Sequence, residues 1–277
     1  MSIKNFIEHK FSIKSHKFSI YTIYIQSLII MGSYLKLLFK HIDKKRDDHN
    51  LMINIGGGNF FRRHWRVLDF PAQWYNYKSR IIDYKFDLTS NKPLPFSDNS
   101  VAFFYSSHTL EHIPQEFCQH ILDEIYRCLK PGGAVRITVP DLDFAYKAFG
   151  KRNIGFFVKY LGQNIEEKFL CFFASYMMDK VSPKELWKNY KRLKKEEFCD
   201  FYAQQIPRRY QKQFTGYHIN WWNYNKIRRM LIKAGFKNVY RSTEQRSRFS
   251  EMRGVGKYWG FDSTHPELSL FAEAVKT

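Results

Sequence analysis

Cysteine is scarce in this sequence, with only four in 277 residues, at positions 118, 128, 171 and 199. No two of them form a C-x-x-C pair, and none lies near a histidine at the spacing typical of metal ligands. We therefore predict no metal site. Few, scattered thiols are also typical of a reducing compartment. We expect a cytoplasmic protein whose cysteines are buried as small apolar side chains.

A cleaved signal and an uninterrupted hydrophobic run are also missing. Residues 18–42 are largely apolar, but Gln26 and Lys36 lie within them and no small-x-small cleavage site follows. The polar residues of this segment recur at a spacing that would place them on one narrow stripe of a helix. This pattern predicts a helix packed against the main domain of the chain. Peripheral contact of this helix with a membrane, or a membrane span, stays open at this point. Residues 44–50 then read as a polar linker.

Acidic residues are too few to balance the basic ones, since 45 Lys and Arg face 26 Asp and Glu and give a net charge of +19. Residues 51–143 carry ten of each sign, whereas residues 1–50, 144–220 and 221–277 carry +5, +8 and +6. A basic surface attracts anionic partners, such as phosphorylated substrates, nucleic acid or anionic membranes. A surface that merely keeps the protein soluble explains the same charge.

Residues 51–143 alternate between short apolar segments and helical connections. A helix is predicted at 114–130, with one apolar face, and Pro131, Gly132 and Gly133 are expected to end it. Five segments have the pattern of strands: residues 51–55, 66–70, 80–88, 101–106 and 134–139. Strands that alternate with helices predict a mostly parallel sheet.

The remaining chain adds an insertion and completes the sheet. Residues 144–220 lose the strand pattern, are basic and contain 18 aromatic residues, so we interpret them as an inserted helical lid or substrate subdomain. A helix is predicted at 222–235, with strands at 238–242 and 268–275. The predicted fold is α/β: a mostly parallel seven-stranded sheet with an inserted helical subdomain and an N-terminal helical extension. Its parts are residues 1–50 (extension), 51–143 (cofactor-binding core), 144–220 (insertion) and 221–277 (the rest of the core).

The glycines Gly56, Gly57 and Gly58 directly follow the first predicted strand. Glycines let the backbone approach a ligand closely, and ligands of open α/β sheets bind at the carboxyl ends of the strands. The dinucleotide pattern G-x-G-x-x-G is not met, because Phe61 occupies its last position, and this disfavours NAD.

Two acids are predicted at the ends of the next two strands. Asp69 could accept hydrogen bonds from ribose hydroxyls, and Asp87 could accept one from an adenine amine. Either acid alone could simply begin a turn or cap a helix. Both together, beside the glycines, favour a neutral nucleoside over a polyphosphate.

Two segments carry a more specific resemblance. LPFSDNSVAFFYSSHTLEHI (residues 94–113) and CLKPGGAVRITVPDLDF (128–144) resemble class I S-adenosylmethionine-dependent methyltransferases, most of all the small-molecule subgroup associated with surface polysaccharide biosynthesis. NYNKIRRMLIKAGFKNVYRS and ELSLFAEAVK resemble the penultimate helix and the last strands of that fold. The resemblance covers residues 51–143 and 218–277, and leaves 144–220 unmatched. It implies a Rossmann-like sheet that binds S-adenosyl-L-methionine.

The resemblance also implies the cofactor contacts. Asp69 would bind the ribose, and Asp87 with Leu88 would flank the adenine. The methionine side would lie near the remaining predicted residues, which are Asn54, Gly56, Gly57, Gly58, Ser107 and His108. The chain departs from the family pattern in having Asn54 where an acid is usual. It departs again in the short connection between Gly58 and the second predicted strand.

Three histidines are candidates for acid–base catalysis: His112, His108 and His218. His112, beside Glu111, could deprotonate a substrate hydroxyl because the pKa of histidine lies near neutrality. It could equally orient its loop through hydrogen bonds. Methyl transfer to a good nucleophile often needs mainly proximity and alignment, so the chemistry does not demand a base.

Three functions are compatible with these features. The first is methyl transfer from S-adenosyl-L-methionine to a small phosphorylated or glycosylated acceptor, such as a sugar, nucleotide sugar or lipid-linked saccharide, because aromatic faces and cations suit such groups. The second is nucleic-acid methylation. Neither an Asn/Asp-Pro-Pro-Tyr/Phe motif nor a Pro-Cys pair is present, which disfavours the usual base-directed chemistries and leaves RNA ribose methylation open. The third is a non-catalytic, membrane-associated Rossmann-like protein.

Overall fold

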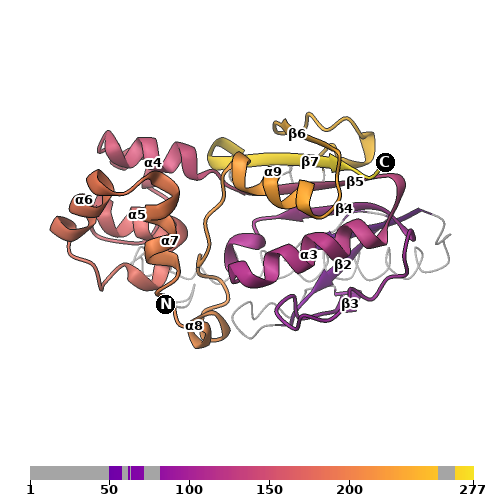
Figure 1. Cartoon of the computed structure of the whole chain (residues 1–277), viewed down its shortest axis with the longest axis horizontal. Coiled ribbons are helices and arrows are strands. Elements are labelled where there is room, and N and C mark those ends of the chain that lie inside the picture. The colour runs from indigo at the N-terminus through magenta and orange to yellow at the C-terminus, as the bar shows by residue number, and fades with distance from the viewer. Residues whose placement is uncertain (1–49, 58–61, 63, 72–81, 255–265) are drawn as a thin grey trace, which may run out of the picture. The chain divides into compact units, whose positions relative to one another are not determined.

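Seven strands form one sheet in the order β3-β2-β1-β4-β5-β7-β6 (Figure 1). The computed structural model describes residues 50–57, 62, 64–71, 82–254 and 266–277, all within the compact unit Asp47–Thr277. The predicted helix at 18–42, the linker at 44–50 apart from its last residue, and Gly58 lie outside these residues. Within them, no helix has the length and apolar character needed to cross a membrane.

The first five strands run parallel to one another, and β7 runs antiparallel to both of its neighbours. Their bounds are β1 Leu51–Ile55, β2 Trp65–Asp69, β3 Tyr84–Lys85, β4 Val101–Ser107, β5 Leu129–Pro140, β6 Asn238–Ser242 and β7 Ser269–Val275. The predicted Rossmann-like, mostly parallel seven-stranded sheet is confirmed. The segment after the short connection, β2, is the strand that pairs with β1.

Several predicted boundaries were wrong. The helix predicted at 114–130 is α3, Gln115–Cys128, and it ends before the Pro-Gly-Gly sequence. Leu129 is already extended and pairs with Val101, so strand pairing ends the helix earlier than the breakers would. Within the described part of the segment predicted at 80–88, only Tyr84 and Lys85 form a strand.

One face of the sheet is covered by α3 and by α9, Tyr224–Lys233, which lie side by side in Figure 1. The apolar positions of α3 recur every three or four residues, so Ile121, Leu122 and Ile125 all point into the core between helix and sheet. This packing holds α3 rigidly, and therefore also holds the short segment that joins it to the end of β4.

The insertion is helical, as predicted, and has a hydrophobic core of its own. It contains α4 Leu142–Gly150, α5 Ile165–Phe173, α6 Pro183–Arg192, α7 Lys195–Ala203 and α8 Arg208–Gln213. The ring of Phe149 stacks on Phe169 and Trp187, with ring centroids 4.3 and 4.4 Å apart. Seven of its 18 aromatic residues are almost fully buried in this core: Phe149, Phe157, Phe169, Phe172, Phe173, Phe198 and Tyr202. We predicted stacking on a ligand from the aromatic content, but much of that content builds the insertion itself.

A buried ion pair joins β5 to β7. Arg136 and Glu273 are register partners, their side chains are fully buried, and the guanidinium donates to the carboxylate. Tyr240 on β6 donates to the other oxygen of Glu273 at 2.5 Å, and Arg136 donates to the carbonyl of Thr243 at 2.8 Å. These bonds fix how the antiparallel strand sits against the parallel part of the sheet.

Replacing Glu273 by alanine should lower the free energy of unfolding by about 3–5 kcal/mol, because Arg136 would stay buried without its counter-charge. The exposed pair of Lys159 and Glu267 provides the control, and Glu267→Ala should cost at most about 1 kcal/mol. Urea unfolding of both variants measures the difference. Equal losses of unfolding free energy in the two variants would show that the buried pair of Arg136 and Glu273 contributes no more to stability than the exposed pair.

Candidate functional site

The carboxyl ends of β1, β2, β3 and β4 meet at one edge of the sheet, because these neighbouring strands are parallel. Gly56 and Gly57 directly follow β1, and Asp69 is the last residue of β2. Asp87 lies two residues beyond β3 rather than at its end, and Ser107 is the last residue of β4 rather than following it. The fold thus collects the predicted cofactor residues at a single edge, although they are spread over more than fifty positions of the sequence.

Each of the two acids also serves its own turn. Asp69 accepts a hydrogen bond from the backbone of Phe70 at 2.7 Å. Asp87 accepts from the backbone and the hydroxyl of Thr89, at 2.8 and 2.7 Å, through the same carboxylate oxygen Oδ1. Each acid therefore forms the turn that the sequence left open as an alternative role, and these hydrogen bonds orient both carboxylates. Leu88 beside Asp87 is buried and packs in the core under the sheet.

Asn54, near the end of β1, offers an unused acceptor beside the glycine turn. The side chain of Asn54 is 3% exposed, yet its Oδ1 has no hydrogen-bond partner in the described part of the chain. A Cβ placed on Gly57 would lie 2.5 Å from Val67, so glycine is required there by packing against β2. The unused buried acceptor is what a bound donor, such as the amino group of S-adenosyl-L-methionine, would satisfy. Asn54 therefore fits this cofactor.

Thr109 joins the glycine turn to the loop after β4. Gly56 has a φ of +69°, and a Cβ there would lie 2.2 Å from the Thr109 hydroxyl oxygen. The hydroxyl donates to the carbonyl of Ile55 at 3.2 Å. Because Thr109 immediately precedes the short 3-10 helix η3, Leu110–His112, the turn and this helix hold each other in place.

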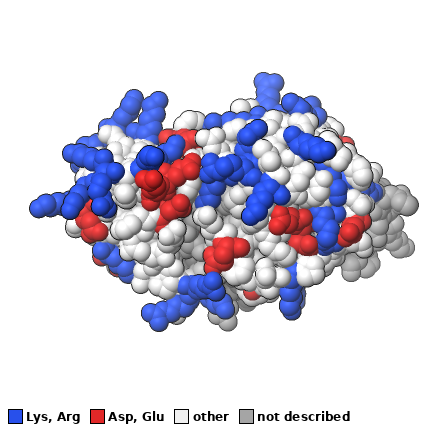
Figure 2. All heavy atoms as spheres, viewed as in Figure 1, with Lys and Arg blue, Asp and Glu red and all other residues white. Residues whose placement is uncertain are grey.

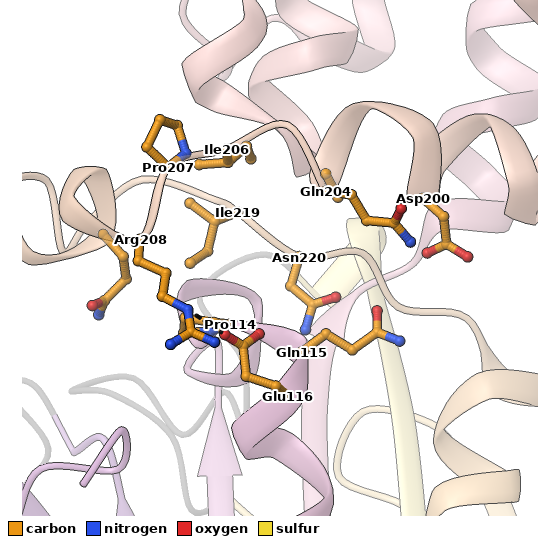
Figure 3. Close-up of a pocket in the computed structure, with 12 residues that line it drawn as sticks. Pro114, Gln115, Glu116, Asp200, Gln204, Ile206, Pro207, Arg208, Ile219 and Asn220 are labelled. Atoms are coloured by element: carbon orange, nitrogen blue, oxygen red, sulfur yellow. Dashed lines mark ion pairs between the residues drawn. The ribbon is translucent and has the colours of Figure 1, made fainter.

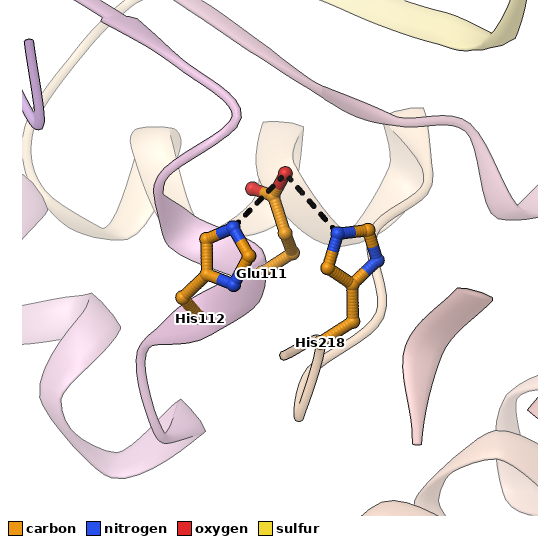
Figure 4. Close-up of side chains that lie close together, drawn as sticks. All are labelled: Glu111, His112 and His218. Atoms are coloured by element: carbon orange, nitrogen blue, oxygen red, sulfur yellow. Dashed lines mark ion pairs between the residues drawn. The ribbon is translucent and has the colours of Figure 1, made fainter. Parts of the chain in front are cut away.

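The three predicted histidines lie around the buried carboxylate of Glu111, and Figure 4 draws two of them, His112 and His218. His108 Nδ1 lies 3.0 Å from Glu111 Oε1, and Nε2 of His112 and of His218 lie 3.9 and 4.0 Å from the same oxygen. His218 comes from the loop after α8, far along the chain from the other two. The fold thus brings this third candidate histidine beside the other two.

Backbone carbonyls orient two of these rings. The Nδ1 atoms of His112 and His218 bond to the carbonyls of Tyr217 and Phe172, at 3.0 and 2.7 Å. A carbonyl only accepts, so each Nδ1 carries a proton, and each ring turns its Nε2 toward Glu111. His108 instead bonds to Glu111 through Nδ1 and to the Ser269 hydroxyl through Nε2, at 2.9 Å.

The surroundings set two protonation states at this site. Burial by itself raises the pKa of Glu111, but the hydrogen bond from His108 and the three nearby imidazoles outweigh it and lower that pKa to about 2. Burial, reinforced by His112, lowers the pKa of His218 to about 4 against the opposing effect of Glu111. At neutral pH the site therefore holds an ionised carboxylate beside a neutral His218.

A pocket of about 470 Å³ lies beside this cluster (Figure 3). It is formed by the start of α3 and by the segments around α7 and α8, with Ile219 and Asn220 between them. The backbone amides of Ile219 and Asn220 donate to the carbonyl of Glu111 at 2.9 and 3.1 Å, so the pocket and the histidines share two segments. The pocket could not be predicted from the sequence, because its lining residues form no motif and come together only in the folded chain.

Basic side chains are spread over the face seen in Figure 2, in several groups with acidic groups between them. Exposed Lys and Arg lie on α6, such as Lys184 and Lys188, and on α9, such as Arg228 and Arg229. Acidic residues such as Glu196 and Glu197 on α7 interrupt them. This face is thus a mixed surface and does not form one continuous basic patch.

Comparisons with known proteins point to methyltransferases. Residues 72–137 match a family described as a methyltransferase domain. The comparison with curated proteins gives no match. The family match spans all of β3, β4 and α3 and most of β5, and so includes Asp87, Ser107 and the three residues of η3.

Solved methyltransferase structures align with most of this chain at low similarity. An S-adenosylmethionine-dependent methyltransferase from Thermotoga maritima is 14% identical, with a TM-score of 0.39, and the alignment covers 95% of this chain and 99% of that one. The CurJ carbon methyltransferase is 10% identical, with a TM-score of 0.38, covering 88% and 54%. Phosphoethanolamine N-methyltransferase 2 of Haemonchus contortus is 15% identical, with a TM-score of 0.37, covering 88% and 52%. The chain thus spans about half the length of the last two.

The contact between Gly56 and Thr109 can be tested against a matched glycine. Gly132 also has a positive φ, of +79°, but a Cβ there would meet nothing within 4 Å. Gly132→Ala should cost only the backbone strain, about 1–2 kcal/mol, whereas Gly56→Ala should cost about 1–3 kcal/mol more because Thr109 must move. Urea unfolding gives both values. Adding Thr109→Ala to Gly56→Ala should recover part of the lost stability. Equal losses of stability at Gly56 and Gly132 would contradict the close contact between Gly56 and Thr109.

Proposed function

We propose that this chain transfers the methyl group of S-adenosyl-L-methionine to a small phosphorylated or glycosylated acceptor. The observation that carries the proposal is the single sheet edge where the glycine turn, Asp69 and Asp87 follow three adjacent parallel strands. The match of residues 72–137 to a methyltransferase domain supports it independently. A second support is the unused buried acceptor of Asn54 beside the glycines.

The residues of this edge divide the cofactor between them. Backbone groups of Gly56 and Gly57 and the amide oxygen of Asn54 would hold the methionine end. Asp69 would accept from the ribose hydroxyls and Asp87 from the adenine amine. The cofactor supplies a methyl group activated by a sulfonium, so the protein has mainly to align the acceptor with it.

The acceptor would meet the cofactor beside the histidines. This cluster follows β4 directly, and Thr109 ties it to the glycine turn. His112 turns its Nε2 toward the ionised carboxylate of Glu111, which suits it to take up a proton from an acceptor hydroxyl. Burial lowers the pKa of His218 to about 4, so His218 is the weaker base of the two. His108, bonded to Glu111 and Ser269, would act by positioning that carboxylate.

The chemistry of the neighbouring pocket favours a polar acceptor. Amide side chains line it, those of Gln115, Gln204 and Gln211, together with the ion pair of Arg208 and Glu116. Amides both donate and accept, as recognition of several sugar hydroxyls requires. The net charge of +8 on the insertion adds attraction for a phosphate on the acceptor. We therefore place a saccharide or nucleotide sugar ahead of RNA, for which the mixed surface in Figure 2 offers less support.

Replacing Asp69 by alanine should weaken S-adenosyl-L-methionine binding about 10- to 100-fold, because charge-assisted hydrogen bonds to the ribose would be lost. Asp98→Ala is the matched control. Asp98 is an exposed acid that pairs with Arg127 near the amino end of β4, and its loss should leave the affinity unchanged. Isothermal titration calorimetry measures both. An unaltered affinity in Asp69→Ala would disprove the assignment of Asp69 to the ribose. A folded wild-type chain that does not bind S-adenosyl-L-methionine would disprove the proposed methyltransferase function.

Transfer of a tritiated methyl group identifies the acceptor class. We expect label in a lipid-linked saccharide or nucleotide-sugar fraction, and none in bulk RNA beyond that given by Asp69→Ala. Label in RNA alone would favour the nucleic-acid alternative. Cofactor binding without transfer to either fraction would count against both acceptor classes.

A further inference from the structure

Three potential metal ligands converge at the site of Figure 4. Oε1 of Glu111 and one ring nitrogen each of His112 and His218 lie within 4.8 Å of one another. The carboxylate is 1% exposed, and the imidazoles are 15% and 17% exposed. One side of the group is thus closed by protein, while the histidines leave an approach from solvent.

The two imidazoles are already oriented as metal ligands are. A ligating histidine binds the ion through one nitrogen and donates its other N–H to a carbonyl or carboxylate, which fixes the tautomer and ring orientation. His112 and His218 both donate from Nδ1 to backbone carbonyls, of Tyr217 and Phe172. His108 donates to the carboxylate oxygen itself, the usual support for an acidic ligand.

This arrangement leaves ligand atoms unused at its centre. The Nε2 atoms of His112 and His218 lie 3.9 and 4.0 Å from a carboxylate oxygen of Glu111, too far for hydrogen bonds. The second oxygen of Glu111 is buried and has no hydrogen-bond partner in the described part of the chain. Buried polar atoms are almost always satisfied, so the unused acceptor points to a cation that binds here.

We propose that Glu111, His112 and His218 bind one divalent ion of the zinc type. Two imidazoles and one carboxylate are a ligand set that zinc favours, and three protein ligands leave a position open for water or substrate, as in catalytic zinc sites. Ligands about 2.1 Å from a tetrahedral ion lie about 3.4 Å apart. The distances of 3.9 and 4.0 Å from Glu111 to the two imidazoles must therefore shorten by about 0.5–0.6 Å, and the two ring nitrogens, which lie within 4.8 Å, must approach by at most about 1.4 Å. We did not predict this site from the sequence, because spacing alone does not reveal that His218 lies beside His112.

An ion here would also deepen the proposed function. If the chain transfers methyl groups as proposed, an acceptor hydroxyl bound at the open position would lose its proton more readily, because a zinc-type ion lowers the pKa of a bound hydroxyl. The two histidines would then act as ligands, and the ion would take over the activation otherwise assigned to them. The binding of the ion does not itself depend on that function.

Metal titration of the full-length, chelator-treated chain tests the proposal. We expect one Zn²⁺ to bind per chain, and Co²⁺ to give the strong visible absorption of a four-coordinate site. His112→Ala and His218→Ala should each lower the affinity at least about 100-fold, and His108→Ala about 10- to 100-fold, as for the loss of a supporting residue. His120→Ala provides the matched control. His120 is a half-buried histidine of α3 outside the proposed site, and its Nε2 bonds to the carbonyl of Lys92. This variant should bind like the wild type.

Two further measurements keep every outcome decisive. Circular dichroism checks that each variant is folded, and His112→Gln and His218→Gln replace the alanine variants if these unfold. Binding that survives in the double histidine variant, or no binding of either ion to the folded wild type, would overturn the proposal. Calorimetry with S-adenosyl-L-methionine on the same metal-free sample is independent. Loss of one kind of binding with retention of the other therefore separates the two proposals.

Discussion

The buried carboxylate of Glu111 links the sheet to the helical insertion. Its side chain accepts from His108, directly after β4, and its backbone carbonyl accepts from Ile219 and Asn220 at the end of the insertion. An ionised group can stay in the interior only if charges or hydrogen bonds replace its hydration. The loop after β4, the segment around His218 and the start of β7 must therefore remain together, and the site is built where they meet.

The insertion contributes to this site through its own packing. The stacked aromatic rings fix α5, and the carbonyl of Phe172 near the end of α5 then holds the ring of His218. The backbone amide of His218 donates to Ser175, just beyond α5. A stiff aromatic core thus places one imidazole opposite another that belongs to the sheet. Aromatic residues that look like a ligand surface in the sequence act here as structural support.

Local sequence patterns predicted the bounds of a strand well where pairing with a neighbouring strand did not change those bounds. The predicted bounds of β1 and β6 agree with the structure, and β1 is a short, mostly apolar run that ends directly before the glycines. Predictions failed where a distant partner decides the boundary. Leu129 leaves α3 because Val101 offers it a strand to pair with, and the extent of β3 depends on β2 rather than on the apolar run at 80–88. The pairing of Arg136 with Glu273 depends on the register of β5 and β7, which neither segment contains in itself.

The sequence by itself determined the α/β class, the segments that form most of the strands, and the glycine turn and Asp69 at the carboxyl ends of the first two. These follow from periodicity and from the rule that parallel strands end at one edge, both of which are local or topological properties. Only the tertiary structure decided that His218 faces His112 across Glu111, and that a polar pocket opens beside them. Side chains distant in the chain meet according to how helices and strands pack, and packing depends on all of the residues at once.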